Sequence, residues 1–473
     1  MRTSYARTIV ALTAAAAFAG CDFNINNPNS PEPIGNNATQ GQVGAAAIGL
    51  LITERADVTN WILKTAIMGR EGYRLDTADP RFTTELLAGP LDPSNGAFGG
   101  GQWTAEYRTI TSGYTILNVI GTAQIADSQK NAVRGFVQTI QALSFLQILN
   151  AHTEDSIPID VNRTIDQPLA PLVTNAAAYA HVVSLLDSAR TWLLAANTFP
   201  FDPGPGFAGF NTPATFLKFN RALVARVRVY QASPSAPGSG TVALWDSALT
   251  ALAASFVDPA ASMDLGAYNA FSTGNQDAPN ALSQDPASAI QLVHPFIKDS
   301  VELQTGGSAP DRRFLAKVTA RSAPGAAQAD TFALACLKSA LSWIRYPSPS
   351  AAVPIIRNEE LLLLRAEANW FGATGSKAQA ITDLNTVRTV SGNLDVTTAT
   401  IASTDSAFVN ALLHERLYSL LYEGHRWVDM RRYGRLNQMI IDRPSGCPAA
   451  GIPKDTVFST LPINSFEVDA RKP

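Results

Sequence analysis

The sequence predicts a mainly α fold built from helical hairpins that resemble tetratricopeptide pairs, with long irregular loops inserted between them. In seven segments, apolar residues recur three and four positions apart, which is the spacing of one face of a helix. Small residues stand where paired helices would approach closely, and a glycine-containing break at 372–376 separates two of the segments. The segments 69–101 and 257–354 lack this spacing and are rich in Gly and Pro. We therefore expect the helices to form a scaffold and these two segments to carry the ligand-binding loops.

The first twenty residues have the pattern of a lipoprotein signal peptide. Arg2 and Arg7 precede an apolar run that is too short to span a bilayer. The run ends in Phe-Ala-Gly directly before Cys21, which resembles a bacterial lipobox and predicts cleavage before Cys21 and lipidation of its thiol. The alternative is an ordinary secretory signal with an incidental cysteine. The residues that follow are rich in Asn and Pro, so 21–40 are expected to be a lipidated cysteine and a flexible tether.

The rest of the chain, 41–473, is expected to be a single domain. Its helical scaffold is predicted over 41–256 and 355–435, and the strict 34-residue tetratricopeptide consensus is absent, so we expect hairpins and not a regular array. The periodic segments, in order, are 103–117, 133–150, 179–193, 216–230, 242–256, 361–371 and 380–387.

The charge, the His spacing and the absence of catalytic motifs give no support to nucleic-acid binding, a metal site or catalysis. The net charge is −3 and 16% of the residues are charged, which gives no electrostatic footprint for nucleic acid. The five His residues lack metal-ligand spacing, and no G-x-S-x-G motif or P-loop is present, so we expect no enzyme, no metal and no cofactor. After lipidation of Cys21 only Cys336 and Cys447 remain, and the sequence leaves open whether they form a disulfide.

Seven motifs follow one another along the chain. They are WTAEYRTI (103–110), AVRGFVQTIQALSFLQIL (132–149) with Ile157-Pro158-Ile159, ALVARVRVYQA (222–232), Asp311-Arg312-Arg313-Phe314, VPIIRNEELLLLRAEANW (353–370), HERLYSLLYEGHRWVDMRRYGRL (414–436) and Leu461-Pro462-Ile463. Taken together and in this order, they resemble the SusD/RagB family of outer-membrane nutrient-binding lipoproteins. The resemblance implies a tetratricopeptide-like scaffold with binding loops, a place on the cell surface, and docking as a lid on a SusC-like TonB-dependent transporter. It implies an oligosaccharide ligand, with peptide or another polymer fragment as alternatives.

Aromatic side chains in the loop segments are the candidate ligand-binding residues. Sugar rings pack their C–H faces on aromatic rings, while amides, carboxylates and Arg bind the hydroxyls. Ordinary loop anchoring is an equally good interpretation of each residue. The candidates are Tyr73, Arg74, Asp76, Arg81, Phe98, Tyr268, Trp343 and Tyr346.

The segment 415–435 carries an unusual density of Arg, carboxylate and aromatic residues. Arg416 and Glu423 are seven apart and would share a helix face, which Arg426 would join if the helix continued past Gly424. We favour a structural ion-pair network over a binding site, because Arg satisfies buried carboxylates bidentately. The expected members are Arg357, Glu360, Arg416, Glu423, Arg426, Asp429 and Arg432.

Two functional alternatives to a nutrient-binding lipoprotein stay open from the sequence. A lipid-anchored helical-repeat adaptor would use the same scaffold to bind protein. A surface glycan hydrolase would need two carboxylates at a working separation, which spacing along the chain does not fix.

Overall fold

Helices dominate the computed structural model, which describes residues 34–235, 241–275, 277–307, 309–322, 329–397 and 403–472. The residues from Asn36 onward form one compact unit. The expected signal peptide, Cys21 and most of the expected tether lie outside the described residues. No helix in the described ranges is long and apolar enough to cross a membrane.

The folded body begins before the expected end of the tether. The backbone N–H of Asn37 donates to Thr122 Oγ1 at 3.0 Å, and the N–H of Gln124 donates to the carbonyl oxygen of Ala38. Thr39 then caps the first described helix, α2 (Gln40–Glu54), through a reciprocal contact with Gln42. Residues 36–39 are therefore packed against the 3₁₀ turn η3 (Ile120–Thr122).

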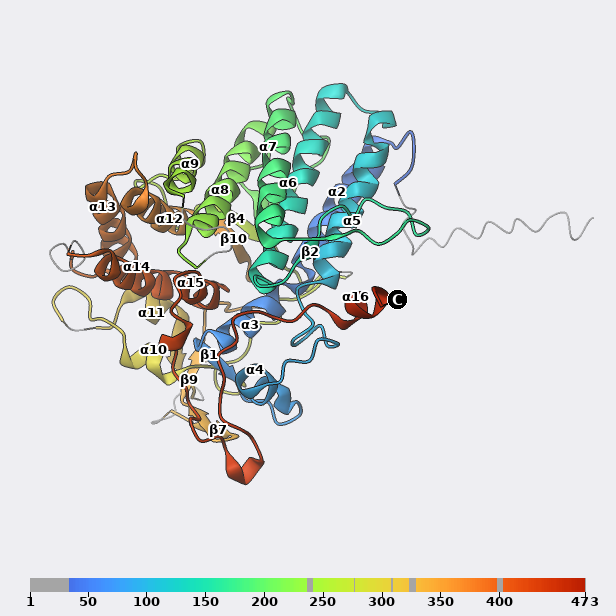
Figure 1. Cartoon of the computed structure of the whole chain (residues 1–473). Helices are drawn as coiled ribbons and strands as arrows, with labels where there is room; N and C mark the ends of the chain where they lie inside the picture. Colours follow the sequence, from blue (N-terminus) through green and yellow to red (C-terminus); the bar gives the residue numbers. More distant parts are fainter. Residues whose placement is uncertain are drawn as a thin grey trace, which may run out of the picture. The chain divides into compact units, whose positions relative to one another are not determined.

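The seven periodic segments are all helical, which confirms the mainly α prediction. Figure 1 shows most of them side by side, with α6 next to α7 and α7 next to α8. The helices are α5 (Thr104–Val119), α6 (Asp127–Ala151), α7 (Asn175–Leu194), α8 (Pro213–Ala232), α9 (Val242–Ala253), α12 (Asn358–Phe371) and α13 (Lys377–Val387). Close packing depends on small residues. A Cβ on Gly135 of α6 would lie 2.5 Å from Leu193 Cγ of α7.

The segments predicted to be irregular contain short strands that the sequence analysis missed. Four of them form an antiparallel sheet in the order β1 (Gly72–Arg74), β5 (Gln291–Val293), β9 (Leu341–Trp343) and β6 (Val318–Ala320). Another pair joins β4 (Gly266–Asn269) to β10 (Val353–Arg357). Two further pairs join β2 (Ile157–Pro158) to β3 (Leu172–Val173) and β7 (Phe332–Leu334) to β8 (Leu337–Ser339). The two loop segments therefore contribute strands to the interior.

The remaining elements are mostly short. They are η1 (Arg55–Asp57), α3 (Val58–Met68), η2 (Pro80–Phe82), α4 (Glu85–Ala88), η4 (Pro205–Phe207), α10 (Pro295–Asp299), α11 (Arg312–Lys317), the π-helical turn η5 (Arg388–Gly392), α14 (Asp405–Ser419), α15 (Arg426–Arg432), η6 (Leu436–Gln438), η7 (Pro448–Ala450) and α16 (Ser465–Ala470). The sequence analysis did not identify α2 and α3 as separate helices.

A disulfide joins Cys336 to Cys447, with 5.8 Å between their Cα atoms. It connects the turn between β7 and β8 to the segment that precedes η7. This resolves the alternative that the sequence left open.

Candidate functional site

The segment 415–435 is divided between two helices, so the expectation that Arg416 and Glu423 share a helix face is wrong. Helix α14 ends at Ser419, Tyr422 and Gly424 have positive φ values of 61° and 86°, and a new helix begins at Arg426. Glu423 lies in the turn, because the left-handed backbone at its two neighbours breaks the helical hydrogen bonding.

Asp429 is the centre of one buried cluster of charges. Its two carboxylate oxygens accept from Arg416 Nε at 2.8 Å and from Arg432 Nε at 2.9 Å. Burial alone would raise the pKa of Asp429, but the Arg416 and Arg432 charges outweigh it and lower the pKa to about 2. Arg432 also donates from Nη2 to the carboxylate of Glu367 in α12, and the same carboxylate accepts from the Tyr433 hydroxyl. These contacts join α14, α15 and α12.

Glu423 is the centre of a second buried cluster. Its carboxylate contacts Arg357 and Arg345 at 3.1 Å each and Lys317 at 3.4 Å. Burial works against the charged form of Glu423, yet the Arg357, Lys317 and Arg345 charges hold its pKa well below the usual range. Lys317 and Arg345 come from the loop-rich segment 257–354, and Arg357 is the last residue of β10, so this cluster fastens both to the turn after α14.

Two residues expected in the network have other partners. Glu360 pairs with Arg226 of α8 at 2.6 Å, and Arg226 was not among the expected members. Arg426 donates from Nε to the carbonyl oxygen of Gly69 and lies over the Phe296 ring, 5.0 Å from its centroid. Sequence spacing gave no sign of either contact, because each partner is more than a hundred residues away.

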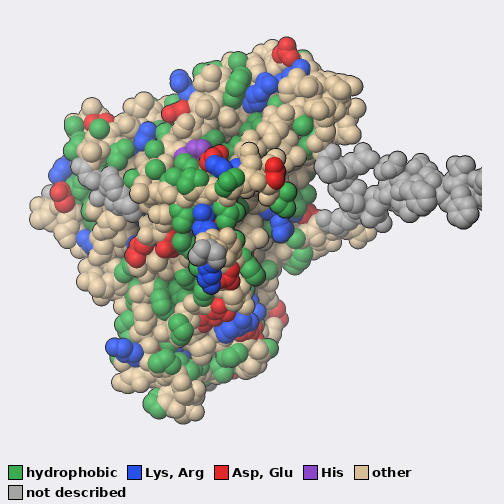
Figure 2. Space-filling view, turned by 45° about the vertical axis from the view of Figure 1, so that its right-hand side comes forward, with side chains coloured by type: hydrophobic (Ala, Val, Ile, Leu, Met, Phe, Trp, Pro, Cys, Tyr) green, Lys and Arg blue, Asp and Glu red, His purple; other side chains and the backbone are tan. Residues whose placement is uncertain are grey.

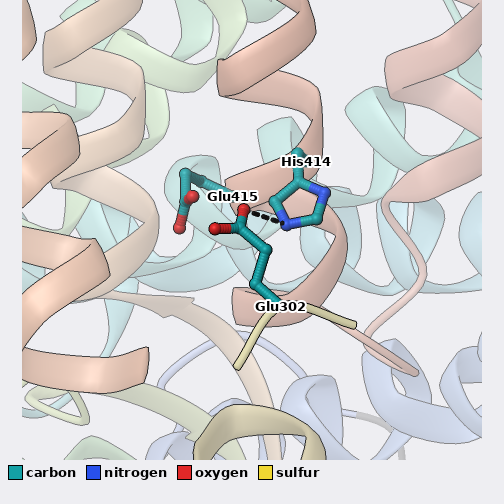
Figure 3. Close-up of side chains that lie close together, drawn as sticks. All are labelled: Glu302, His414 and Glu415. Carbon is teal, nitrogen blue, oxygen red and sulfur yellow. Dashed lines mark ion pairs between the residues drawn. The ribbon is translucent and has the colours of Figure 1, made fainter. Parts of the chain in front are cut away.

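A third cluster brings together Glu302, His414 and Glu415 (Figure 3). Among the described residues it is the only group of three His, Cys, Asp or Glu side chains close enough to share a cation. The buried Glu415 carboxylate is already paired with Arg313 and Arg388, and Arg388 also pairs with Glu302 at 2.7 Å. Guanidinium groups therefore supply the positive charge that a metal ion would supply.

The structure places four of the predicted ligand-binding aromatics in the core, so that interpretation needs correction for them. Tyr73, Phe98, Trp343 and Tyr346 are each at most 4% exposed. Trp343 stacks on Tyr422 with ring centroids 4.2 Å apart, and the Tyr346 hydroxyl donates to the Tyr422 carbonyl oxygen. No ring face of these four residues is open to a ligand in this structure.

The polar candidates reach the surface but form ion pairs within their own segment. Arg74 contacts Asp76 at 2.9 Å and lies over the ring of Phe82. Arg81 contacts Asp79 at 2.7 Å and lies over the Phe98 ring. These ion pairs hold the segment after β1 in place.

Tyr268 lines a hollow of about 260 Å³, near the small end of the range for ligand pockets. One wall comes from the last two turns of α2, another from the loop before η4, and the third from β4 and the residues after it. The apolar lining residues are Ile48, Leu51, Ile52, Pro203, Pro205, Phe207, Ala270 and Phe271, and the polar ones include Arg55, Tyr268, Asn269, Ser272 and Asp277. The hollow is thus mainly apolar with a polar edge.

Glycine allows the walls of the hollow to approach each other. A Cβ on Gly206 would lie 2.0 Å from the carbonyl oxygen of Tyr268, so only glycine fits against β4 there. Gly204, directly before η4, has a φ of 86°, a left-handed backbone conformation that favours glycine. The Tyr268 hydroxyl donates to the carbonyl oxygen of Asp264, and burial raises the pKa of Tyr268 to about 12.

Arg55 closes one side of the hollow. It pairs with Asp277, donates to the carbonyl oxygen of Ala270, and lies over the Phe271 ring at 5.4 Å from its centroid. Burial lowers the pKa of Arg55, which the nearby Glu54 charge partly offsets. The guanidinium, the carboxylate and the ring give the edge both hydrogen-bonding groups and a flat apolar surface.

Charges elsewhere on the surface are mixed. Figure 2 shows Lys and Arg side chains next to Asp and Glu side chains on the face it presents, without a broad area of one sign. This agrees with the small net charge of −3.

Residues 345–463 match the model of the SusD family. The whole fold is similar to a SusD superfamily protein from Bacteroides vulgatus, with a TM-score of 0.65, 16% identity, and coverage of 91% of this chain and 97% of that one. Residues 345–463 are therefore similar to the SusD family, and the chain has a SusD-like fold. A SusD superfamily protein from Bacteroides thetaiotaomicron is similar to a like degree, with a TM-score of 0.64, 16% identity and coverage of 92% and 98%. NanU of B. fragilis gives a TM-score of 0.60 at 14% identity, with coverage of 94% and 98%. No curated protein matches the chain.

The SusD family match and the hollow occupy different parts of the chain. The matched residues include the buried clusters around Glu423 and Asp429. None of the residues that line the hollow falls between 345 and 463. The match to the SusD family model therefore covers none of the residues that line the hollow.

Proposed function

We propose that this protein is a SusD/RagB-type cell-surface nutrient-binding lipoprotein of the outer membrane, anchored through lipid on Cys21. Its ligand is an oligosaccharide, and it serves as a lid that delivers the ligand to a SusC-like TonB-dependent transporter. The hollow between α2, η4 and β4 is the ligand site. The observation that carries the proposal is this hollow, with Tyr268, Phe271 and polar edge groups, on a SusD-type scaffold.

Binding without catalysis fits the groups present at the hollow. Among the described residues that line it, Asp277 is the only acidic one, and its carboxylate is paired with Arg55. A glycoside hydrolase of the usual kind needs two carboxyl groups about 5–10 Å apart across the scissile bond. The hollow offers one, which favours capture of a ligand over cleavage.

The proposal is tested with the mature lipoprotein in detergent and a panel of oligosaccharides and peptides, read by calorimetry. Ile52 lines the hollow and is 48% exposed, so Ile52→Asp places a charge on the apolar wall with little effect on folding. We expect this variant to lose at least tenfold in affinity for the oligosaccharide that binds. The matched control is Leu194→Asp at the end of α7, where the side chain is 63% exposed and is not among the residues that line the hollow.

Several outcomes would contradict the proposal. If the two variants bind the oligosaccharide with equal affinity, the hollow is not the ligand site. Release of cleaved product from any oligosaccharide would favour the hydrolase, and binding of protein without any oligosaccharide or peptide would favour the adaptor. The transporter role is tested by co-purification from cells, where we expect a TonB-dependent transporter to accompany the protein.

A further inference from the structure

Five large apolar side chains are exposed on two neighbouring segments, residues 165–172 and the C-terminal helix α16. Ile165 has its whole side chain in solvent, and Phe466 of α16 is 71% exposed. Arg471 Nη2 donates to the carbonyl oxygen of Ala170 at 2.8 Å, which joins the end of α16 to the segment that carries Ile165. Single exposed apolar residues are ordinary, but a cluster indicates an interaction surface. We name this cluster the terminal apolar surface; its members are Ile165, Leu169, Leu172, Phe466 and Val468.

The terminal apolar surface lies beside the place where the chain enters the folded body. The side-chain amides of Asn118 and Asn162 bond to each other in both directions, at 3.1 and 3.3 Å. One turn further along, Thr122 Oγ1 accepts from the backbone N–H of Asn37. The segment with Ile165 and the first residues of the body therefore meet at the same end of α5 (Figure 1).

The length of the chain before the body limits its distance from a lipid anchor. Residues 22–35 lie between Cys21 and Asn36. Such a segment spans at most about 50 Å when fully extended. With Cys21 lipidated, as proposed above, the terminal apolar surface lies beside the first residues of the body that follow the anchor.

The charges around this surface favour apolar contact over attraction to anionic headgroups. Every basic side chain named here is paired with a carboxylate of its own segment, so the two segments offer no excess positive charge. The pairs are Arg163 with Asp160, Arg471 with Glu467, and Lys472 with Asp469.

We propose that the terminal apolar surface contacts the membrane that holds the lipid anchor, with Ile165 and Phe466 inserted among the lipid headgroups. This rests on the proposed lipidation of Cys21. Apolar side chains of this size stabilise such contact by leaving water, as they do in helices that lie in a membrane interface. The contact would fix which face of the protein points away from the bilayer, beyond what a flexible tether alone can do.

The test places a fluorescent probe beside Ile165 in the lipidated protein on phosphatidylcholine vesicles. Cys21 carries lipid and the other two cysteines are bonded to each other, so Thr164→Cys supplies a single free thiol next to an intact Ile165. A nitroxide lipid quenches the probe when it reaches the headgroups. Val242→Cys on α9, at a residue that is 49% exposed, is the control site.

We expect at least threefold stronger quenching at 164 than at 242. Adding Ile165→Asp should return the quenching at 164 to that of the control, because burying one Ile side chain shifts the equilibrium by roughly tenfold or more. Raising the salt should change neither value. Equal quenching at the two sites, or loss of quenching in high salt, would overturn the proposal. Quenching at 164 that grows with protein density would indicate contact with a second copy and would also overturn it.

Failure of this proposal is separable from failure of the proposed function. Ile165→Asp should leave the affinity for oligosaccharide within twofold of the parent, since Ile165 is not among the residues that line the hollow. Mass spectrometry of the mature N-terminus reports lipidation of Cys21 independently.

Discussion

Replacing Asp429 with Asn tests whether the buried charges hold the last helices together. The substitution keeps the shape of the side chain but removes the negative charge between Arg416 and Arg432. Arg416 is 1% exposed, and its Nη1 and Nη2 atoms are buried without a hydrogen-bond partner among the described residues. Its contact with Asp429 is therefore its principal charge compensation. Breaking one partner of a buried ion pair costs about 3–5 kcal/mol.

The pKa of Asp429 gives a second route to the magnitude. A fall from 3.8 to about 2 corresponds to roughly 2.5 kcal/mol of stability at neutral pH. Because the folded-state pKa lies below the unfolded one, this stability is present above pH 3.8 and is lost as the pH falls through 2. We therefore expect Asp429→Asn to lower the free energy of unfolding by about 2.5–5 kcal/mol at pH 7, and the difference from the parent to narrow toward pH 2.

The assay is urea denaturation of parent and variant at several pH values. Asp469→Asn is the control, because Asp469 and its partner Lys472 are 61% and 67% exposed and such surface pairs contribute less than about 1 kcal/mol. The reasoning is refuted if Asp429→Asn changes stability no more than Asp469→Asn does. It is also refuted if the difference from the parent stays constant between pH 7 and pH 3.

Three further substitutions probe other parts of the scaffold. Burial raises the pKa of Glu71 from 4.5 to about 8, so the folded protein loses stability as the pH rises above 4.5. In urea denaturation at pH 9, the free energy of unfolding of Glu71→Gln should exceed that of the parent by about 2 kcal/mol or more. At pH 5 the difference should be smaller. The disulfide closes a loop of 111 residues, so replacing Cys336 and Cys447 by Ser should lower the free energy of unfolding by about 2–4 kcal/mol. A reducing agent should lower the stability of the parent by the same amount and leave the variant unchanged. Arg426→Ala removes the contacts with Gly69 and Phe296, so it should lower the melting temperature while the ligand Kd from calorimetry stays within twofold; unchanged melting with lost binding would contradict it.

The helical scaffold was predictable because its helices are long enough to repeat their apolar spacing. Helix α6 runs for 25 residues and α12 for 14, so each repeats its apolar spacing several times. The four-stranded sheet left no such trace. Each of its strands has three residues, and β1 pairs with β5 more than two hundred residues later. A strand of three residues is too short to show the alternation of apolar and polar side chains that identifies a strand. The Gly- and Pro-rich composition therefore predicted loops at these positions.

Four of the eight ligand-binding candidates are buried for a related reason. Tyr73 and Trp343 lie in Gly- and Pro-rich segments, but β1 and β9 carry them through the interior. The hollow was not predicted because no helix was identified at 40–54, which carries Ile48 and Ile52, and because the Pro-Gly-Pro-Gly run at 203–206 is typical of an ordinary turn. Only the fold brings these segments together, and Tyr268 was the one candidate that it placed there.

The buried charges and the hollow are connected through one pair of strands. Glu423 binds Arg357, and Arg357 is the last residue of β10. Strand β10 pairs with β4 in the register Pro354 with Tyr268, so the ion pair fixes the strand that holds the wall of the hollow. Since a buried carboxylate with three cations has little freedom to move, Glu423 positions this wall from a distance. The segment 415–435 thus supports the wall of the proposed ligand site without lining it.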